Sequence, residues 1–178
     1  MDSHERIRQD EAIARGLTSL EEWHKAELVY AYLSFGAEID THALVREAWA
    51  SNKQVAIPYC IPGTRRMRWF LIDSFEGLVR SDLGVEEPVP DVRREVSGAG
   101  TRTSLSLVPA LCYDRHGYRL GYGKGFYDVF LAGFEGVSVG LCREGSLYAD
   151  LHEMGLRESH DRPVSIVVSN VRAMVATP

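Results

Sequence analysis

The chain has 178 residues, enough for one domain with a large hydrophobic core. Its residues are 45% hydrophobic and 25% charged, as in ordinary globular proteins, and no apolar run approaches the roughly 20 residues that cross a bilayer. The net charge of −5, without a basic tail or basic helix, argues against a nucleic-acid binder and leaves only a local basic patch open.

The cysteines and the N-terminal residues indicate the compartment. Cys60, Cys112 and Cys142 are odd in number and far apart, which argues against a disulfide framework or a zinc site. The six histidines also lack the spacing of zinc ligands. Residues 1–16 are charged and contain no apolar signal-peptide segment. We therefore expect a cytoplasmic protein, a monomer or weak dimer, with no membrane or nucleic-acid partner.

The first half of the chain predicts helices, strands and one long loop. Apolar side chains at helical spacing predict two helices, 10–25 and 41–52. Apolar runs of strand length predict three strands, 27–35, 54–58 and 66–72. Asp40 or Thr41 can cap the second helix, and Pro58 is expected to end the second strand. The Pro- and Gly-rich stretch 82–103 predicts a surface loop of the kind that is often functional.

The second half predicts the same alternation. Buried strands are expected at 104–111, 136–141 and 163–169. Helices are expected at 124–133 and 145–156. Strands that alternate with helices at this spacing indicate an α/β fold, here a three-layer sandwich with a mostly parallel sheet and helices on both faces. We expect a single domain over residues 1–178.

The most informative segment is 108–131, in which a strand leads through a glycine-rich turn into a helix. Its glycines occupy positions 117, 121, 123 and 125. Such a turn lets backbone N–H groups approach an anion closely, and the start of a helix adds favourable partial charge. Arg119 and Lys124 bring two cations to this loop, and Asp128 near the helix start can bind Mg²⁺.

The order of residues in this loop excludes two common phosphate-binding patterns. The Walker pattern fails because Gly125, not Ser or Thr, follows Lys124, and the glycines are spaced differently from the Rossmann pattern. Taken singly, the glycines fit a plain tight turn. Together with the two cations, two tyrosines and Asp128 in register, they favour a phosphate site.

Residues 117–131 closely resemble the signature of the 5-formyltetrahydrofolate cyclo-ligase family, with every fixed position present: GYRLGYGKGFYDVFL. The preceding VPALCYD is similar to the family's strand that ends in Val-Pro and is followed by Phe-Asp, with Tyr113 and Asp114 in those places. Further similar elements are 31–41, the pair Glu87-Pro88 and 158–161. The resemblance covers roughly residues 12–170.

The resemblance implies an ATP-dependent ligase of folate and one-carbon metabolism. Such an enzyme cyclises 5-formyltetrahydrofolate to 5,10-methenyltetrahydrofolate through a phosphorylated formyl intermediate, and releases ADP and phosphate. The implied catalytic residues are Arg119, Lys124 and Tyr127. The implied ATP contacts are Arg119, Gly121, Tyr122, Gly123, Lys124, Gly125, Phe126 and Tyr127. The implied folate contacts are Leu33, Glu38, Tyr122, Gly123, Lys124, Gly125 and Phe126, and the implied Mg²⁺ ligands are Asp128 and Asp161.

The sequence also departs from the family pattern. The family usually starts with a helix that carries Lys-x-x-x-Arg, and this chain is expected to begin inside or after that helix, so that the helix is short or missing. Arg6 and Arg8 are the candidate replacements, and weak ATP binding is expected. Ser104 stands where an Asp often opens the Val-Pro strand, and the glutamine that precedes the late His-Asp element is not evident.

Several alternatives stay open. Without the resemblance, Glu38 is most simply a solvated loop carboxylate, and Asp161 a cap. Arg65 most simply belongs to the solvent face of a strand, although it can also attract a polyglutamyl tail. A non-catalytic nucleotide- or folate-binding paralogue, which lost the ATP-contacting helix, is the main rival function. A sugar-phosphate enzyme on a related fold ranks last.

Overall fold

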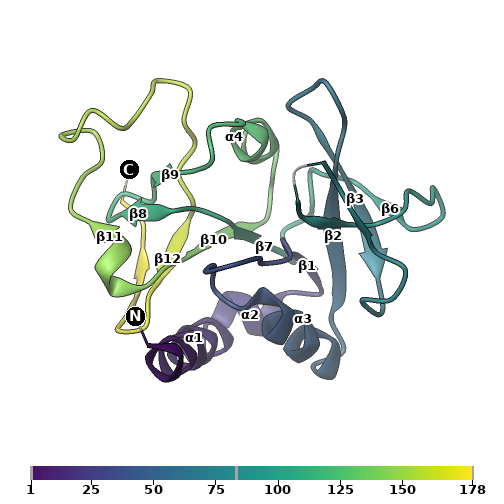
Figure 1. Cartoon of the computed structure of the whole chain (residues 1–178), viewed down its shortest axis with the longest axis horizontal. Helices are drawn as coiled ribbons and strands as arrows, with labels where there is room; N and C mark the ends of the chain where they lie inside the picture. The colour runs from purple at the N-terminus through teal and green to yellow at the C-terminus, as the bar shows by residue number, and fades with distance from the viewer. Residues whose placement is uncertain (1, 83, 178) are drawn as a thin grey trace.

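The computed structural model describes residues 2–82 and 84–177, and a large sheet dominates this part of the chain (Figure 1). In spatial order, the eight described strands are β13 (Ala173–Val175), β12 (Ile166–Val168), β10 (Val137–Leu141), β7 (Ser104–Val108), β1 (Leu28–Tyr30), β2 (Gln54–Cys60), β3 (Met67–Ile72) and β6 (Glu95–Val96). The central strands from β12 to β2 are parallel, and the outer strands pair antiparallel. The predicted mostly parallel sheet is therefore confirmed.

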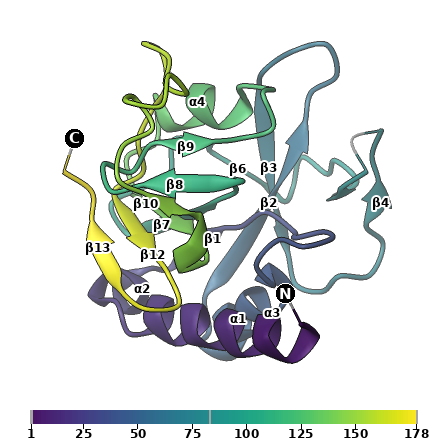
Figure 2. The same cartoon turned by 60° about the vertical axis from the view of Figure 1, so that its left-hand side comes forward.

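Helices cover both faces of this sheet, which confirms the three-layer prediction. One face carries α1 (Ser3–Thr18), α2 (Glu21–Lys25) and α3 (Thr41–Ala50), and the other carries α4 (Phe126–Leu131) (Figures 1 and 2). The chain also forms a small sheet of β11 (Leu147–Tyr148), β8 (Cys112–Asp114) and β9 (Arg119–Leu120), and a 3-10 turn (Glu144–Ser146) directly precedes β11. A two-stranded ribbon of β4 (Val79–Arg80) and β5 (Glu86–Glu87) completes the described elements.

Amphipathic packing explains the helices on the first face. Ile13 and Leu17 of α1 are fully buried against the sheet, together with Leu44 of α3. Burying such a side chain contributes about 1.5–3 kcal/mol. Asp40 caps α3 as predicted, because its side chain accepts a hydrogen bond from the backbone N–H of Ala43 at 3.1 Å.

The order of the strands determines where a ligand can bind. From β1 the chain crosses through α3 to β2 on one side, whereas from β7 it crosses through α4 to β10 on the other side. Since β1 and β7 are neighbours, their following loops diverge in opposite directions. In open α/β sheets, ligands bind in the crevice outside the carboxyl ends of strands at such a switch point.

Three predicted boundaries differ in the structure. The helix expected at 10–25 begins earlier, at Ser3, and divides into α1, which has 16 residues, and α2. The strand expected at 27–35 is shortened to β1. Strand β2 does not end at Pro58 but continues to Cys60. Beyond Ala56 the side of β2 that faces β1 has no strand partner, so the missing amide of Pro58 interrupts no ladder hydrogen bond. Between residues 82 and 103, β5 and β6 interrupt the expected loop, of which residue 83 lies outside the described part.

The helix predicted for residues 145–156 is wrong. The segment begins in the 3-10 turn, continues into β11 and then consists of turns. Parallel pairing of Leu147 with Tyr113 holds the segment extended, and the backbone N–H of Leu151 donates to the buried carboxylate of Asp114 at 3.0 Å. These long-range contacts override a weak local preference for helix.

The main sheet and the small sheet pack closely at Gly140, which generates a test of the fold. A Cβ atom at Gly140 would lie 2.3 Å from Cζ of the fully buried Tyr113. We expect Gly140→Ala to lower the free energy of unfolding by about 1–3 kcal/mol, because the tyrosine ring must move. Urea denaturation measures this difference.

Gly133→Ala is the matched control, since a Cβ atom there meets nothing within 4 Å. Its free energy of unfolding should stay within about 0.5 kcal/mol of the wild-type value or rise slightly. Equal stability of the two variants would contradict the close packing of the two sheets.

Candidate active site

A cavity of about 660 Å³ lies outside the carboxyl ends of β1, β2 and β7. Its volume is typical of small-molecule sites. The residues that line it are Tyr32, Leu33, Phe35, Glu38, Pro58, Cys60, Arg65, Met67, Val85, Glu86, Glu87, Pro109, Arg119, Gly121–Asp128, Leu156, Glu158, His160 and Asp161. The cavity therefore occupies the switch point of the sheet.

Every residue that the sequence proposed for catalysis, nucleotide, folate or metal lines this one cavity. They are Leu33, Glu38, Arg119, Gly121, Tyr122, Gly123, Lys124, Gly125, Phe126, Tyr127, Asp128 and Asp161. These residues come from the turn after β1, the loop between β9 and α4, and the segment before β12. The fold thus brings together positions that are more than 120 residues apart in the chain.

The loop from β9 to α4 is built on two left-handed glycines. Gly123 and Gly125 have φ angles of 74° and 71°, which other residues rarely adopt. A side chain at Gly125 would also meet Arg65, whose Cδ would lie 3.3 Å from the added Cβ. The helix that follows has only six residues, Phe126–Leu131, and is shorter than the predicted 124–133. The loop backbone, more than the helix end, forms this wall.

The two cations of the loop have different environments. Lys124 is exposed at the cavity and makes no hydrogen bond or ion pair with the residues that the structure describes. The side chain of Arg119 is only 6% exposed. It donates to Asp128 Oδ1 at 2.7 Å and to the carbonyl oxygen of Arg162 at 2.6 Å. Lys124 is therefore available to a ligand, whereas Arg119 already has protein partners.

Asp128 and Asp161 face the cavity with part of each carboxylate in use. Oδ1 of Asp128 also accepts from the backbone N–H of Arg162 at 3.1 Å, and Oδ2 of Asp161 accepts from that of Glu158 at 2.7 Å. The other oxygen of each carboxylate has no hydrogen bond from residues 2–82 or 84–177. No group of three potential metal ligands occurs in this described part. One or two carboxylates together with phosphate oxygens are a usual environment for Mg²⁺, so the pair fits a metal that is shared with a phosphate ligand.

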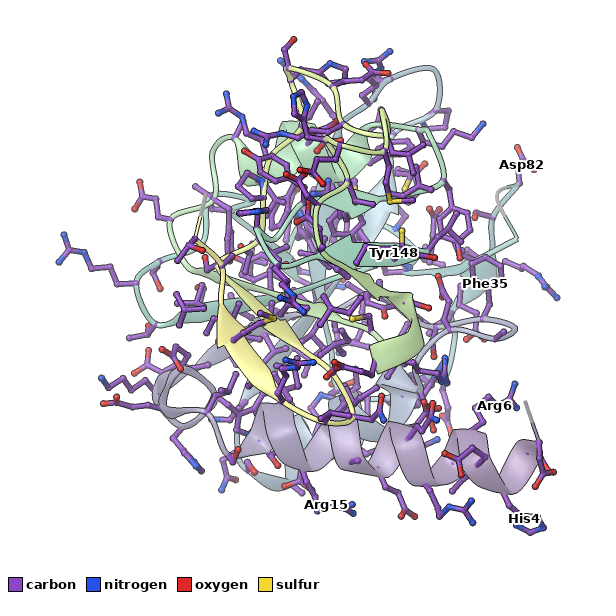
Figure 3. The ribbon with its side chains drawn as sticks, turned by 90° about the vertical axis from the view of Figure 1, so that its left-hand side faces the viewer. His4, Arg6, Arg15, Phe35, Asp82 and Tyr148 are labelled. Atoms are coloured by element: carbon purple, nitrogen blue, oxygen red, sulfur yellow. The ribbon has the colours of Figure 1, made fainter. Side chains whose placement is uncertain are left out.

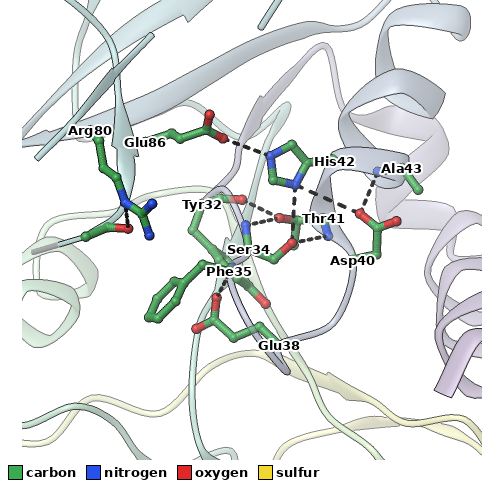
Figure 4. Close-up of polar contacts among 11 residues, drawn as sticks. Tyr32, Ser34, Phe35, Glu38, Asp40, Thr41, His42, Ala43, Arg80 and Glu86 are labelled. Carbon is green, nitrogen blue, oxygen red and sulfur yellow. Dashed lines mark hydrogen bonds and ion pairs between the residues drawn. The ribbon is translucent and has the colours of Figure 1, made fainter. Parts of the chain in front are cut away.

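Glu38 connects the turn after β1 to the glycine loop. Its Oε2 accepts from the backbone N–H of Phe35 at 3.0 Å (Figure 4), and its Oε1 accepts from the hydroxyl of Tyr122 at 2.9 Å. Burial and the bond to Glu38 raise the pKa of Tyr122 to about 12, so its hydroxyl remains a donor at neutral pH. The rings of Phe35 and Tyr122 lie 6.1 Å apart between centroids. Glu38 is therefore not a freely solvated loop carboxylate.

A polar network at the start of α3 holds this turn in place (Figure 4). Thr41 donates through its hydroxyl to the carbonyl oxygen of Tyr32 at 2.7 Å and accepts from the backbone N–H of Ser34 at 2.8 Å. His42 lies between Ser34 Oγ, at 3.3 Å, and Glu86 Oε2, at 3.2 Å. The network links the turn after β1 to strand β5.

Tyr127 presents a buried hydroxyl without a partner at the cavity. Its oxygen is inaccessible and makes no hydrogen bond with the described residues. Burial raises the pKa of Tyr127 well above its usual range, so the group can only donate or accept as a neutral phenol. Unsatisfied buried polar groups are rare and costly. This hydroxyl is therefore a strong candidate for a ligand contact.

Arg65 corrects the interpretation of the arginines near β3, because it lines the cavity and is not simply part of a solvent face. By contrast, Arg6 and Arg8 are exposed on α1, Arg8 pairs with Glu5, and neither lines the cavity. Figure 3 shows Arg6 at the start of α1. The sequence interpretation gave Arg65 no role beyond a possible polyglutamyl contact, although its place in the turn between the strands predicted at 54–58 and 66–72 was a usable signal.

Comparisons with known proteins identify the family of the chain. The model of the 5-formyltetrahydrofolate cyclo-ligase family matches residues 1–170. The Arabidopsis thaliana protein "5-formyltetrahydrofolate cyclo-ligase, mitochondrial" is 30% identical over 147 residues, which cover 76% of this chain and 53% of that protein. The Escherichia coli K12 5-formyltetrahydrofolate cyclo-ligase is 33% identical over 111 residues, which cover 62% of this chain and 60% of that protein. The matches thus span between half and two thirds of these relatives.

Solved structures give the same result. The Aquifex aeolicus 5,10-methenyltetrahydrofolate synthetase superposes with a TM-score of 0.81 at 26% identity and covers 100% of this chain and 86% of that one. The Mycoplasma pneumoniae 5,10-methenyltetrahydrofolate synthetase, at 14% identity and a TM-score of 0.71, shares the fold over 96% of this chain and 90% of that one. Because the family model covers nearly the whole sequence and its signature forms the cavity wall, the chain belongs to the 5-formyltetrahydrofolate cyclo-ligase family.

Proposed function

We propose that this protein converts 5-formyltetrahydrofolate to 5,10-methenyltetrahydrofolate in an ATP-dependent reaction that releases ADP and phosphate. The observation that carries the proposal is the convergence of all the signature-derived residues on one cavity at the switch point of the sheet. Membership of the cyclo-ligase family supports the same activity. The enzyme would be a ligase of folate and one-carbon metabolism.

The two substrates would meet across the glycine loop. Leu33 and Glu38 would contact the folate from the turn after β1, with residues 122–126 on the opposite wall. The nucleotide would lie along Arg119 and residues 121–127, with the hydroxyl of Tyr127 as one contact. The aromatic pair of Phe35 and Tyr122 supports this arrangement, because flat rings at a cavity wall suit a flat substrate.

In this reaction the protein mainly has to position the two substrates and stabilise the charge on the transferring phosphoryl group. The γ-phosphoryl group moves from ATP to the formyl oxygen of 5-formyltetrahydrofolate. N10 then attacks the activated carbon, and the C–O bond to phosphate breaks. Lys124 would stabilise charge on the transferring phosphoryl group, because its ammonium has no described partner in the protein. Arg119 would act mainly through Asp128, which it holds in place.

Mg²⁺ would be held by the free carboxylate oxygens of Asp128 and Asp161. Bound there, the ion would supply charge neutralisation to the phosphate groups. The three cysteines are unpaired, which supports the cytoplasmic location that we also propose.

The non-catalytic paralogue is not favoured. The signature residues of the family all lie at the cavity, and Arg65 brings a further cation to its wall. The sequence departs from the family's N-terminal Lys-x-x-x-Arg pattern, but the residues that line the cavity show no matching loss.

The first prediction is direct turnover. Protein mixed with Mg-ATP and 5-formyltetrahydrofolate should show the rising absorbance of the methenyl product, and the rise should require both substrates. Removing Mg²⁺ with EDTA should abolish it, because the phosphate charge would then lack its counter-ion. A folded protein that gives no rise at high enzyme concentration would contradict the proposed activity and return the non-catalytic paralogue to consideration.

The second prediction concerns Lys124→Ala. Removing a donor aimed at transition-state charge typically costs about 2.7–4 kcal/mol, or roughly 100–1,000-fold in rate. Stability should change by less than about 0.5 kcal/mol, because the exposed side chain has no described partner. Steady-state kinetics at saturating ATP measure the rate.

Two companions sharpen the test of Lys124. Lys124→Arg should also be impaired, since a planar guanidinium does not replace a compact ammonium in a tight loop. Lys25→Ala removes the same charge from α2, on the opposite face of the sheet, and should leave the rate unchanged. Near-normal turnover of Lys124→Ala would show that the loop acts through its backbone amides and Arg119 instead.

A further inference from the structure

Glu87 is a buried carboxylate at the cavity to which neither the signature nor the mechanism gives a role. Its residue is 5% exposed, and it lines the cavity from β5. One oxygen, Oε1, accepts from the backbone N–H of Cys60 at 3.2 Å. Within residues 2–82 and 84–177, no lysine, arginine or histidine forms an ion pair with Glu87. A buried carboxylate with so few partners is costly, unless a ligand completes its hydrogen bonds.

Two other carboxylates at the cavity, Glu38 and Asp128, have stronger partners in the protein. Glu38 uses both oxygens, one for Phe35 and one for Tyr122. Asp128 is paired with Arg119. Glu87 therefore differs from Glu38 and Asp128, because its deep burial is not balanced by a tyrosine hydroxyl or a guanidinium partner among the described residues.

A second buried polar group of the same cavity is the hydroxyl of Tyr127, which is assigned to the nucleotide above. The buried hydroxyl of Tyr127 lacks a partner in the described chain and lines the same cavity. Cys60 lies close to both groups. Burial and the nearby Glu87 raise the pKa of its thiol to about 12. After burial, Cys60 is a further cause of the raised pKa of Tyr127. The carboxylate of Glu87 and the hydroxyl of Tyr127 are thus two buried polar groups near the Cys60 thiol.

The ribbon of β4 and β5, which carries Glu87, is bonded to α3 through the neighbouring residue Glu86. Glu86 and Glu87 of β5 both line the cavity, and their hydrogen-bond partners differ. Glu86 bonds His42 at 3.2 Å, and His42 also contacts Ser34 in the turn after β1 (Figure 4). This connection places Glu87 beside the turn that carries Leu33 and therefore on the folate side of the cavity.

We propose that Glu87 is a further substrate-contacting residue: the carboxylate oxygen that Cys60 leaves free accepts a hydrogen bond from an N–H group on the ring system of the reduced folate. The inference rests on the proposed function. The tetrahydropterin ring carries several N–H donors. The triphosphate of ATP and the glutamate tail of folate are anionic and would be repelled by a buried carboxylate. Through this hydrogen bond, Glu87 would favour ligands whose ring system offers an N–H donor.

Glu87→Gln tests the proposal with almost no change in shape. Both partners of Glu87, the Cys60 N–H and the ligand N–H, are donors, and a carboxylate offers each of them an oxygen. A glutamine has one carbonyl oxygen, so its NH₂ group must face one of these donors. The dissociation constant for 5-formyltetrahydrofolate, measured by calorimetry without ATP, should rise roughly 10- to 100-fold. The KM for 5-formyltetrahydrofolate should rise with it, and the KM for ATP should not.

Glu135→Gln is the matched control, because it removes the same charge from an exposed position that does not line the cavity. It should bind 5-formyltetrahydrofolate like the wild type. Thermal unfolding should show that Glu87→Gln remains folded.

The outcomes separate this inference from the proposed function. A wild-type protein that neither binds nor converts 5-formyltetrahydrofolate would contradict the proposed function itself. A wild type that binds the folate, beside a folded Glu87→Gln that binds it equally well, would overturn the role of Glu87 alone. A larger loss of ATP affinity than of folate affinity would also overturn it and place the adenine amino group at Glu87. Equal loss of both ligands with a lowered melting temperature would show that Glu87 is structural.

Discussion

The wall of the cavity depends on the buried contact between Arg119 and Asp128. Arg119 comes from β9, Asp128 from α4, and the third partner is the backbone of Arg162 in the segment before β12. Three stretches of chain that share no strand pairing are joined at this point. Because the guanidinium pairs with Asp128 and donates to the carbonyl of Arg162, it supports this wall of the cavity. The exposed Lys124 is the loop cation that is available to a ligand.

The same division between support and contact holds at the wall of the cavity that carries Glu38. Thr41 and His42 fix the turn after β1 from behind, and Glu38 then reaches across to Tyr122. Protein groups thus satisfy most polar atoms of the cavity walls. Atoms of the cavity that lack described partners lie on Lys124, Tyr127, Glu87, Asp128 and Asp161, and a ligand or metal would complete their bonding. Pre-organised walls with a few open groups are typical of small-molecule sites.

The glycine loop could be predicted from the sequence because its glycines, cations and Asp128 lie within a dozen residues of one another. The mostly parallel sheet could be predicted for a similar reason, since apolar runs and helical spacing are local signals. The surroundings of Glu87 and Tyr127 could not, because their burial depends on chain segments distant in sequence. The helix expected at 145–156 failed for the same reason: its pairing partner, β8, lies more than 30 residues away.

The pairing of Tyr113 with Arg119 has a consequence for how this protein can evolve. The two residues are direct partners across β8 and β9, and the ring of Tyr113 packs over Gly140 of the main sheet. A substitution that shifts the ring also shifts the strand that carries Arg119. Interior substitutions that move this ring should therefore be removed by natural selection because they impair activity, and not only because they impair folding. Variation in this family member should accumulate in places that this strand pair does not touch.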